Sequence, residues 1–149
     1  MRDYTIESVV FPSLRVLAER RRSSLSDIGR RIGALYGLAA AKRLVPAGAV
    51  FAIYFEKPID PTSVDYELCL PVTGAASALG ELPEIGGENC YRIVWRGSYK
   101  GLSGVYDALN ARIADENRSL SAPPREAYAR GPLFGLVPIG LVTEVWYPL

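Results

Sequence analysis

Two glutamates near the C-terminal end of the chain each stand two residues before an aromatic residue. Glu126 precedes Tyr128, and Glu144 precedes Trp146. Side chains two residues apart in a β-strand point to the same face, so each pair would present a carboxylate beside an aromatic ring. This combination suits hydrophobic cations, because each cation–π contact adds roughly 0.5–2 kcal/mol to the charge attraction. We therefore predict a ligand-binding cleft around one of these glutamates.

Each glutamate also has an alternative interpretation. An ionised carboxylate in an apolar cleft is unfavourable unless it is paired or protonated, and burial raises its pKa. Glu144 is predicted as the cleft carboxylate, with a solvated position or pairing with an arginine as the alternative. Glu126 is left open between a cleft position and a surface network with Arg125 and Arg130. In an enzyme, Glu144 or Glu126 would act as the general base or acid, with Tyr128 as the third catalytic residue.

Other aromatic and acidic residues are candidates for the same cleft. Tyr99 stands at a predicted strand–helix turn, where it either closes the groove or packs in the core. Trp95 is predicted as a core residue, with a ligand platform as the alternative. Glu67 is the counterpart of Glu144 and, beside Asp65, is predicted to be solvated. The full set of predicted ligand-binding residues is Glu144, Trp146, Tyr99, Trp95, Tyr128, Tyr66 and Glu67.

Histidine is absent from the sequence. Its absence excludes a Ser-His-Asp or Cys-His nucleophile system. The two cysteines, Cys69 and Cys90, cannot complete a usual zinc ligand set alone. We therefore predict no metal and no cofactor, and two free thiols rather than a disulfide.

The composition is that of one globular domain. Apolar residues make up 49% and charged residues 22% of the 149 residues, both usual for folded proteins. The net charge of +1 provides no overall field for nucleic acid or an acidic membrane. The sequence also lacks the pattern of a signal peptide and an apolar run of bilayer length. We expect a cytoplasmic protein with a small-molecule partner, no direct binding to nucleic acid and no membrane partner.

An internal duplication is indicated by residues that recur at a nearly constant separation. Tyr54 and Tyr128 lie 74 residues apart and are each followed four residues later by proline. Glu67 and Glu144 also stand four residues before a proline, and they lie 77 residues apart. A constant separation that grows by three residues indicates a tandem duplication with an insertion in the second hairpin loop. Chance similarity between short strands is the alternative.

Each half is predicted to contain a strand, a helix and a hairpin. The strands over roughly 14–21 and 91–96 lead to serine N-caps, Ser24 and Ser98. Turn residues at 56–61 and 131–138 predict the two hairpins. The apolar helix stripes are Ile28, Ile32, Leu35 and Ala39 in the first half and Leu102, Tyr106, Leu109 and Ile113 in the second.

These elements predict an α+β fold made of a tandem βαββ duplication. The half-repeats extend over approximately 4–72 and 88–149, joined by a linker over 73–87. The whole chain, 1–149, is predicted to form a single domain.

Four segments in their observed order resemble the GyrI-like small-molecule-binding superfamily. They are DYELCLPV at 65–72, RGSYKGL at 96–102, PREAY at 124–128 and VTEVWYP at 142–148. No single segment is specific, whereas their order and separations are, and the resemblance extends over nearly the whole chain. It implies pseudo-twofold symmetry between the two βαββ units, and an antiparallel sheet with two helices on one face and a ligand groove on the other. It also implies a buried glutamate ringed by aromatic residues.

The resemblance also implies candidate functions. The superfamily includes DNA gyrase inhibitors, effector-binding domains of multidrug-responsive regulators, and hydrolases of cyclopropane-containing genotoxins. We expect binding of hydrophobic, often cationic or aromatic, small molecules for sequestration, sensing or detoxification. The alternative is a hydrolase that opens cyclopropane rings by glutamate and tyrosine catalysis.

DNA gyrase as a partner is the third possibility, and the near-neutral charge gives no sign of DNA mimicry. Only a dozen residues precede the first predicted strand. We therefore expect no helix-turn-helix segment, which counts against a transcription regulator.

Overall fold

The computed structural model describes residues 4–130 and 140–149. Its elements in chain order are β1 (Glu7–Val10), β2 (Leu14–Ser23), a 3-10 turn (Leu25–Asp27), α1 (Ile28–Ala41), β3 (Val45–Pro46), β4 (Phe51–Tyr54), β5 (Val64–Thr73), α2 (Ala76–Leu79), β6 (Glu84–Ile85), β7 (Asn89–Arg96), a second 3-10 turn (Tyr99–Gly101), α3 (Leu102–Asp115), β8 (Arg125–Arg130) and β9 (Val142–Pro148).

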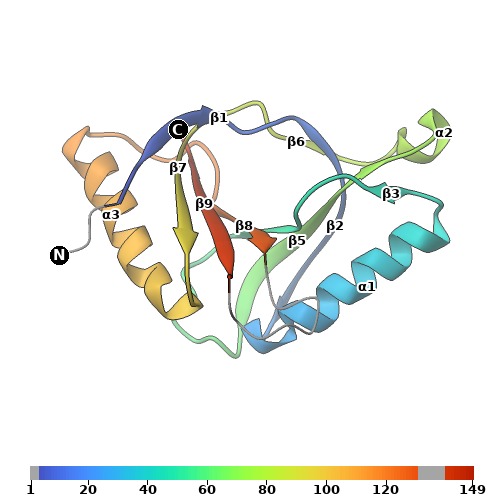
Figure 1. Ribbon diagram of the computed structural model, residues 1–149, viewed down its shortest axis with the longest axis horizontal. Coiled ribbons are helices and arrows are strands. Elements are labelled where there is room, and N and C mark those ends of the chain that lie inside the picture. Colours follow the sequence, from blue (N-terminus) through green and yellow to red (C-terminus); the bar gives the residue numbers. More distant parts are fainter. Residues whose placement is uncertain (1–3, 131–139) are drawn as a thin grey trace.

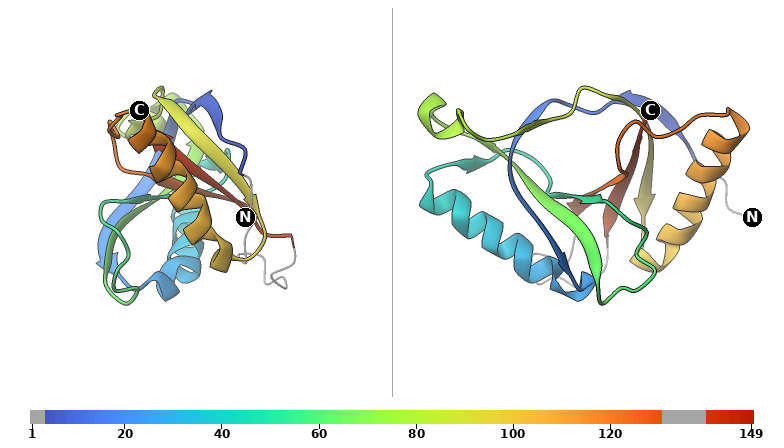
Figure 2. Two further views of the ribbon diagram at one scale, coloured as in Figure 1. Left: turned by 90° about the vertical axis from the view of Figure 1, so that its left-hand side faces the viewer. Right: turned by 180° about the vertical axis from the view of Figure 1, so that it is seen from behind.

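The strands form one antiparallel sheet in the order β1-β7-β9-β8-β4-β5-β2-β6, with β3 added beside β5. Figure 1 shows α1 and α3 on either side of the central strands β8 and β9. The two further views in Figure 2 show that the sheet is strongly curled. The α+β class predicted from the sequence is therefore confirmed.

The strand order repeats across the middle of the sheet, which confirms the tandem βαββ duplication. The units β2-α1-β4-β5 and β7-α3-β8-β9 place their strands in mirrored order around the β4–β8 pair. The register agrees with the sequence separations. Glu67 of β5 pairs with Ile53, and Glu144 of β9 pairs with Ala127, which lies 74 positions after Ile53. The hairpin turn predicted at 131–138 lies outside the described residues.

The β4–β8 pair joins the two halves, and it fixes which side chains share a face. Ala52 pairs with Glu126, and Glu126 in turn pairs with Val145 of β9. Val145 packs against Val105 and Leu109 of α3, so Glu126 belongs to the face that carries the helices.

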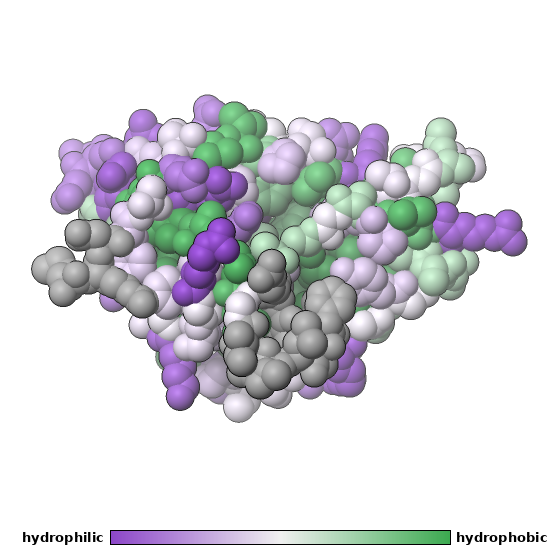
Figure 3. Space-filling view, in the orientation of Figure 1, coloured by the Kyte–Doolittle hydropathy of each residue, from purple (hydrophilic) through white to green (hydrophobic). Residues whose placement is uncertain are grey.

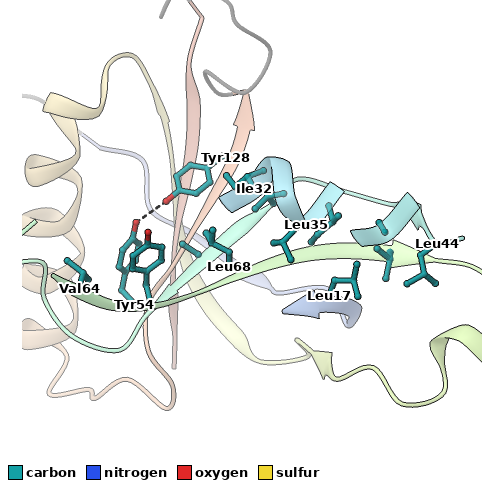
Figure 4. Packing of buried hydrophobic residues seen from close by; sticks show 14 residues of the cluster. Leu17, Ile32, Leu35, Leu44, Tyr54, Val64, Leu68 and Tyr128 are labelled. Carbon is teal, nitrogen blue, oxygen red and sulfur yellow. Dashed lines mark hydrogen bonds between the residues drawn. The ribbon is translucent and has the colours of Figure 1, made fainter. Parts of the chain in front are cut away.

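Buried residues form hydrophobic clusters on both faces of the sheet. Under α1, Ile32 and Leu35 pack with Leu68 of β5 and with Tyr54 and Tyr128 (Figure 4). The other face buries a cluster of Phe11, Val16, Phe51, Ile53, Cys69, Cys90, Ala127 and Trp146. In the space-filling view of Figure 3, hydrophobic residues are visible in the middle of the face and also at its upper edge and right-hand side, with hydrophilic residues between them.

Both long helices begin after a single 3-10 turn. Ser24 caps the first turn, because its hydroxyl accepts a hydrogen bond from the Ser26 amide at 3.2 Å. Asp27 does not cap the helix and instead pairs with Arg30 at 3.0 Å. Ser98 occupies the equivalent position in the second half without a side-chain capping bond.

The segment between the halves contains more structure than predicted. The expected linker over 73–87 includes the short helix α2 and strand β6, which pairs with the start of β2. Strand β1 lies before the first predicted strand and pairs with β7. In the described part of the chain, no helix is both long and apolar enough to cross a membrane.

Candidate functional site

A buried carboxylate lies where the two halves of the sheet meet. Glu126 of β8 is 8% exposed, and its neighbour across the strand pair is the small residue Ala52. Three tyrosines, Tyr54 of β4, Tyr106 of α3 and Tyr128 of β8, surround this carboxylate. The site therefore draws on both halves of the duplication.

All three tyrosine hydroxyls form hydrogen bonds with the Glu126 carboxylate. Tyr128 donates to Oε1 at 3.1 Å and Tyr54 reaches the same oxygen at 3.4 Å. Tyr106 donates to the other oxygen, Oε2. The hydroxyls of Tyr54 and Tyr128 are also 2.9 Å apart, as drawn in Figure 4. Charge-assisted bonds of this kind orient an acceptor firmly.

Burial and hydrogen bonding act in opposite directions on Glu126. Burial raises the pKa of its carboxyl group, the hydrogen bonds from the tyrosines lower it, and burial has the larger effect. Burial, followed by the charge of Glu126, raises the pKa of Tyr54, Tyr106 and Tyr128 well above the ordinary value. The tyrosines therefore remain hydroxyl donors at neutral pH. Among the described residues, no lysine or arginine forms an ion pair with Glu126.

Glu126 opens into a pocket of about 820 Å³. The pocket lies between α3, the segment after β4 and the segment before β8, and Figure 2 shows the loop after β4 beside α3 in the view from behind. Its walls are residues 54–59 and 120–124, together with Ser103, Tyr106, Asp107, Asn110, Glu126 and Tyr147.

The pocket lies on the helix face of the sheet, whereas the resemblance implied a groove on the opposite face. Tyr106 of α3 and Glu126 of β8 both line it. The physical reason is the curl of the sheet, which leaves space between α3 and the central strands. The opposite face is filled by the packed cluster around Phe51 and Trp146.

Glu144 and Trp146 lie on that opposite face, outside the pocket wall. They share a face as their spacing predicted, and the Trp146 indole Nε1 donates to Glu144 Oε1 at 3.1 Å. Trp146 is 4% exposed, and the Arg92 guanidinium lies 5.1 Å from its ring centre. Glu144 is half-buried and forms part of this packed region.

Arg125 does not form a surface network with Glu126. It points to the same face as Trp146, pairs with Glu88 and lies over the Phe11 ring. The side chain of Arg130 is outside the described residues.

The remaining predicted residues are divided between the core and the edge of the site. Trp95 is buried against α3, and its indole donates to the Ser98 carbonyl at 2.8 Å. Tyr66 is buried under α1 and donates to the Ser24 carbonyl. Glu67 is half-buried on the face of Glu144. Tyr99 is 39% exposed and meets the edge of Tyr128, with 6.3 Å between ring centres.

Sequence reasoning did not select Tyr54, Tyr106 or Tyr147 as site residues. In the sequence, Tyr54 is distinguished only as the repeat counterpart of Tyr128, and that relation is the available indication that both lie near the join. Tyr106 belongs to the apolar stripe of the second helix, although its hydroxyl reaches Glu126. Tyr147 donates to Asn110 Oδ1 at 2.7 Å at the pocket wall.

Within the described residues, no group of three or more histidine, cysteine, aspartate or glutamate side chains could hold a metal ion. Cys69 and Cys90 are free and buried, and burial raises the pKa of both thiols. The buried end of the pocket presents one carboxylate and its phenol donors.

Solved structures of several proteins share this architecture. The C-terminal domain of EcmrR is 22% identical with a TM-score of 0.80, and the match covers 97% of this chain and 96% of that one. A hydrolase from Listeria innocua is 10% identical with a TM-score of 0.72, covering 99% and 93%. SAV2435 bound to tetraphenylphosphonium is 14% identical with a TM-score of 0.57, also covering 99% and 93%.

The sheet and helices define an α+β fold built from tandem βαββ units. The chain shares this fold with the three solved structures, and an α+β fold of this kind is what the sequence resemblance implied. The chain spans 57% of the EcmrR chain in its complex with DNA. No protein-family model matches the sequence, and no curated protein matches it significantly.

Proposed function

We propose that this chain binds hydrophobic cations with aromatic groups in the pocket at Glu126. The observation that carries the proposal is a buried carboxylate that opens into a largely apolar cavity and has no cationic partner among the described residues. A buried carboxylate without a counter-charge is unfavourable. A cationic ligand that supplies the counter-charge would offset this cost, and the offset would add to its binding free energy. The pocket volume is within the range of about 300–1,000 Å³ that suits drug-sized ligands.

The pocket walls favour a cation that carries apolar groups. The rings of Tyr54, Tyr106 and Tyr147 line the cavity and can contact a cation face-on. Pro58, Ile59 and the other apolar wall residues remove hydrocarbon surface from water. A small hydrated cation would make the cation–π contacts but would bury little hydrocarbon surface. We therefore expect affinity to rise with the apolar area of the ligand.

Two of the similar structures support this proposal. SAV2435 was solved with tetraphenylphosphonium, a cation enclosed by four phenyl rings. The EcmrR domain belongs to a protein whose structure with DNA is known. We propose a ligand-sensing or sequestering role for the present chain on this basis.

Isothermal titration with tetraphenylphosphonium at pH 8 tests the proposal. Wild-type protein should bind, and Glu126→Gln should weaken binding at least about tenfold, which is about 1.4 kcal/mol. Glu144→Gln is the matched control, because it removes a carboxylate from the opposite face of the sheet and should leave the affinity nearly unchanged. Equal losses in both variants, or no binding by the wild-type protein to this and other aromatic cations, would reject the proposal.

A second candidate function is hydrolysis of cyclopropane-containing genotoxins. A carboxyl group with a raised pKa beside phenol donors is suited to general acid–base catalysis. We propose that Glu126 would activate water or donate a proton, while Tyr106 at the pocket wall would polarise the leaving group and Tyr128 would orient the Glu126 carboxylate. Similarity to a Listeria innocua hydrolase supports this possibility.

Mass spectrometry separates the two candidates. An enzyme should convert a cyclopropane-bearing genotoxin to a product that contains one added water, and Glu126→Gln should abolish that conversion. If the genotoxin binds but no product forms, the hydrolase function is rejected and only the binding function is supported.

A further inference from the structure

The pocket has a polar edge along one helix and an apolar wall opposite. Ser103, Asp107 and Asn110 lie on the same side of α3, because residues three and four apart are neighbours on a helix. The opposite wall includes Pro58 and Ile59 from the loop after β4. A ligand that fills the pocket would therefore meet polar groups along one edge and hydrocarbon along the other.

The charges on the pocket wall are unequal. Among the described wall residues, three carry carboxyl groups, Glu56, Asp107 and Glu126, and one, Lys57, carries an ammonium group. Glu56 is neutralised by Arg22 at 2.7 Å. Two wall carboxylates then have no arginine or lysine partner among the residues that the structure describes, Glu126 in the interior and Asp107 on the exposed side of α3.

Asp107 acts on the same space as the buried part of the pocket. Its charge contributes to the raised pKa of Tyr147, after the larger effect of burial. The Tyr147 ring forms part of the pocket wall, and its hydroxyl donates to Asn110. Asp107, Asn110 and Tyr147 thus form a polar group at the pocket wall that is separate from the tyrosines around Glu126.

We propose that the preferred ligands are elongated dications, with one cationic group at Glu126, the second at Asp107 and an apolar spacer against the wall of Pro58 and Ile59. The Ile59 side chain is 90% exposed, so an apolar spacer lying over it would remove its surface from water. The inference rests on the proposed cation-binding function, and it specifies the ligand class beyond a single charge.

Matched ligands provide the test. Decamethonium carries a trimethylammonium group at each end of a ten-carbon chain, and decyltrimethylammonium carries one on the same chain. Isothermal titration below micelle-forming concentrations should show about two- to fivefold tighter binding of decamethonium, since an exposed charge pair contributes up to roughly 1 kcal/mol, which corresponds to about fivefold. Shorter bis-trimethylammonium chains should lose this advantage when they no longer reach both carboxylates.

Variants locate the second cation. Asp107→Asn should remove the advantage of decamethonium and leave decyltrimethylammonium and tetraphenylphosphonium nearly unaffected. Asp115→Asn, at an exposed position later on α3, is the matched control and should retain the advantage. Lys57→Gln should enlarge it, because the variant removes the one ammonium group on the described wall.

The outcomes distinguish the inference from the function on which it rests. If tetraphenylphosphonium binds in a Glu126-dependent manner but the two alkylammonium ligands bind equally, the dication inference is overturned and the proposed function stands. An unchanged decamethonium advantage in Asp107→Asn also overturns it. If none of these cations binds, both proposals fail.

Discussion

Folding buries the Glu126 carboxylate away from water and places three phenol donors around it. Glu144, in the neighbouring strand β9, instead accepts a bond from a tryptophan indole on the opposite face. The two glutamates have the same residue type and the same spacing to an aromatic residue. Their environments differ because one faces a cavity beneath α3 and the other faces a packed cluster.

Replacing Glu126 should change how stability depends on pH. Because the pKa of this carboxyl is raised in the folded protein, its stabilising contribution is complete below the unfolded pKa, about 4.3, and is lost as pH rises through the folded pKa. Glu126→Gln does not titrate at this position. The melting temperature of the variant minus that of the wild-type protein should therefore be more positive at pH 8 than at pH 4.

Thermal melts without ligand at several pH values measure this difference. We expect it to change by a few degrees, since 1 kcal/mol moves the melting temperature of a domain of this size by roughly 2–4 °C. Glu144→Gln should show a smaller change over the same range. A difference that is constant or decreases with pH would contradict the inferred burial of an ionisable Glu126.

Alternation along a strand predicted which residues share a face, but it did not predict which face contains the pocket. Glu126 and Tyr128 lie together, as do Glu144 and Trp146. The choice between the faces depends on contacts from other elements, above all the hydroxyl of Tyr106 on α3. These contacts link positions distant in sequence, so the spacing within a strand carries no information about them.

At the scale of elements, local patterns predicted the helices and the repeat with good agreement. The serines at the two strand–helix junctions and the apolar stripes of α1 and α3 are found where the spacing placed them. The side of the groove was not predicted correctly, because it depends on the curl of the sheet and on the course of the loop after β4. Those features arise from the packing of whole elements.

The junction before α3 should be sensitive to a single methyl group. A Cβ built at Gly101 would lie 2.0 Å from Cζ2 of the Trp95 ring, which is buried and held by its bond to Ser98. Gly101→Ala should therefore lower stability by about 1–3 kcal/mol, as is usual for overpacking. The variant should have a lower melting temperature than the wild-type protein and an unchanged far-ultraviolet circular dichroism spectrum, which would show that its secondary structure is retained.

Gly37 of α1 provides the matched control. A Cβ there would have no atom within 4 Å, and the position is exposed within a helix. Gly37→Ala should raise stability by about 0.5–1 kcal/mol, because alanine loses less conformational entropy than glycine in a helix. If both variants were destabilised equally, the contact with Trp95 would not explain the result for Gly101.

At the scale of the whole molecule, the pocket owes its asymmetry to differences between equivalent positions. Glu126 corresponds to Ala52, and the two pair directly across the β4–β8 join. Tyr106 corresponds to Ile32, which packs under α1. The second half thus supplies the carboxylate and one donor, whereas Tyr54 and Tyr128 are retained in both halves. The duplication explains the arrangement of strands and helices. The differences between equivalent residues of the two halves explain why the described pocket lies beside α3.

The same join predicts that the two halves unfold together. Two hydrophobic clusters contain residues from both halves, Tyr128 with the α1 cluster and Phe51 with Trp146 on the other face. The sheet is also continuous through β4 and β8, with the Tyr128 amide donating to the Val50 carbonyl at 2.9 Å. Separating the halves would expose both clusters and leave strand edges unpaired, so neither half should remain folded alone.

Urea unfolding followed by two probes tests this cooperativity. Both tryptophans, Trp95 and Trp146, belong to the second half, whereas circular dichroism at 222 nm reports α1 and α3 together. We expect the two signals to change in one transition with a common midpoint and slope. Loss of helical signal before the fluorescence changes would show that α1 unfolds separately, and the β4–β8 join would then not couple the halves. Tetraphenylphosphonium should shift both signals equally, because a ligand of the native state stabilises the entire cooperative unit.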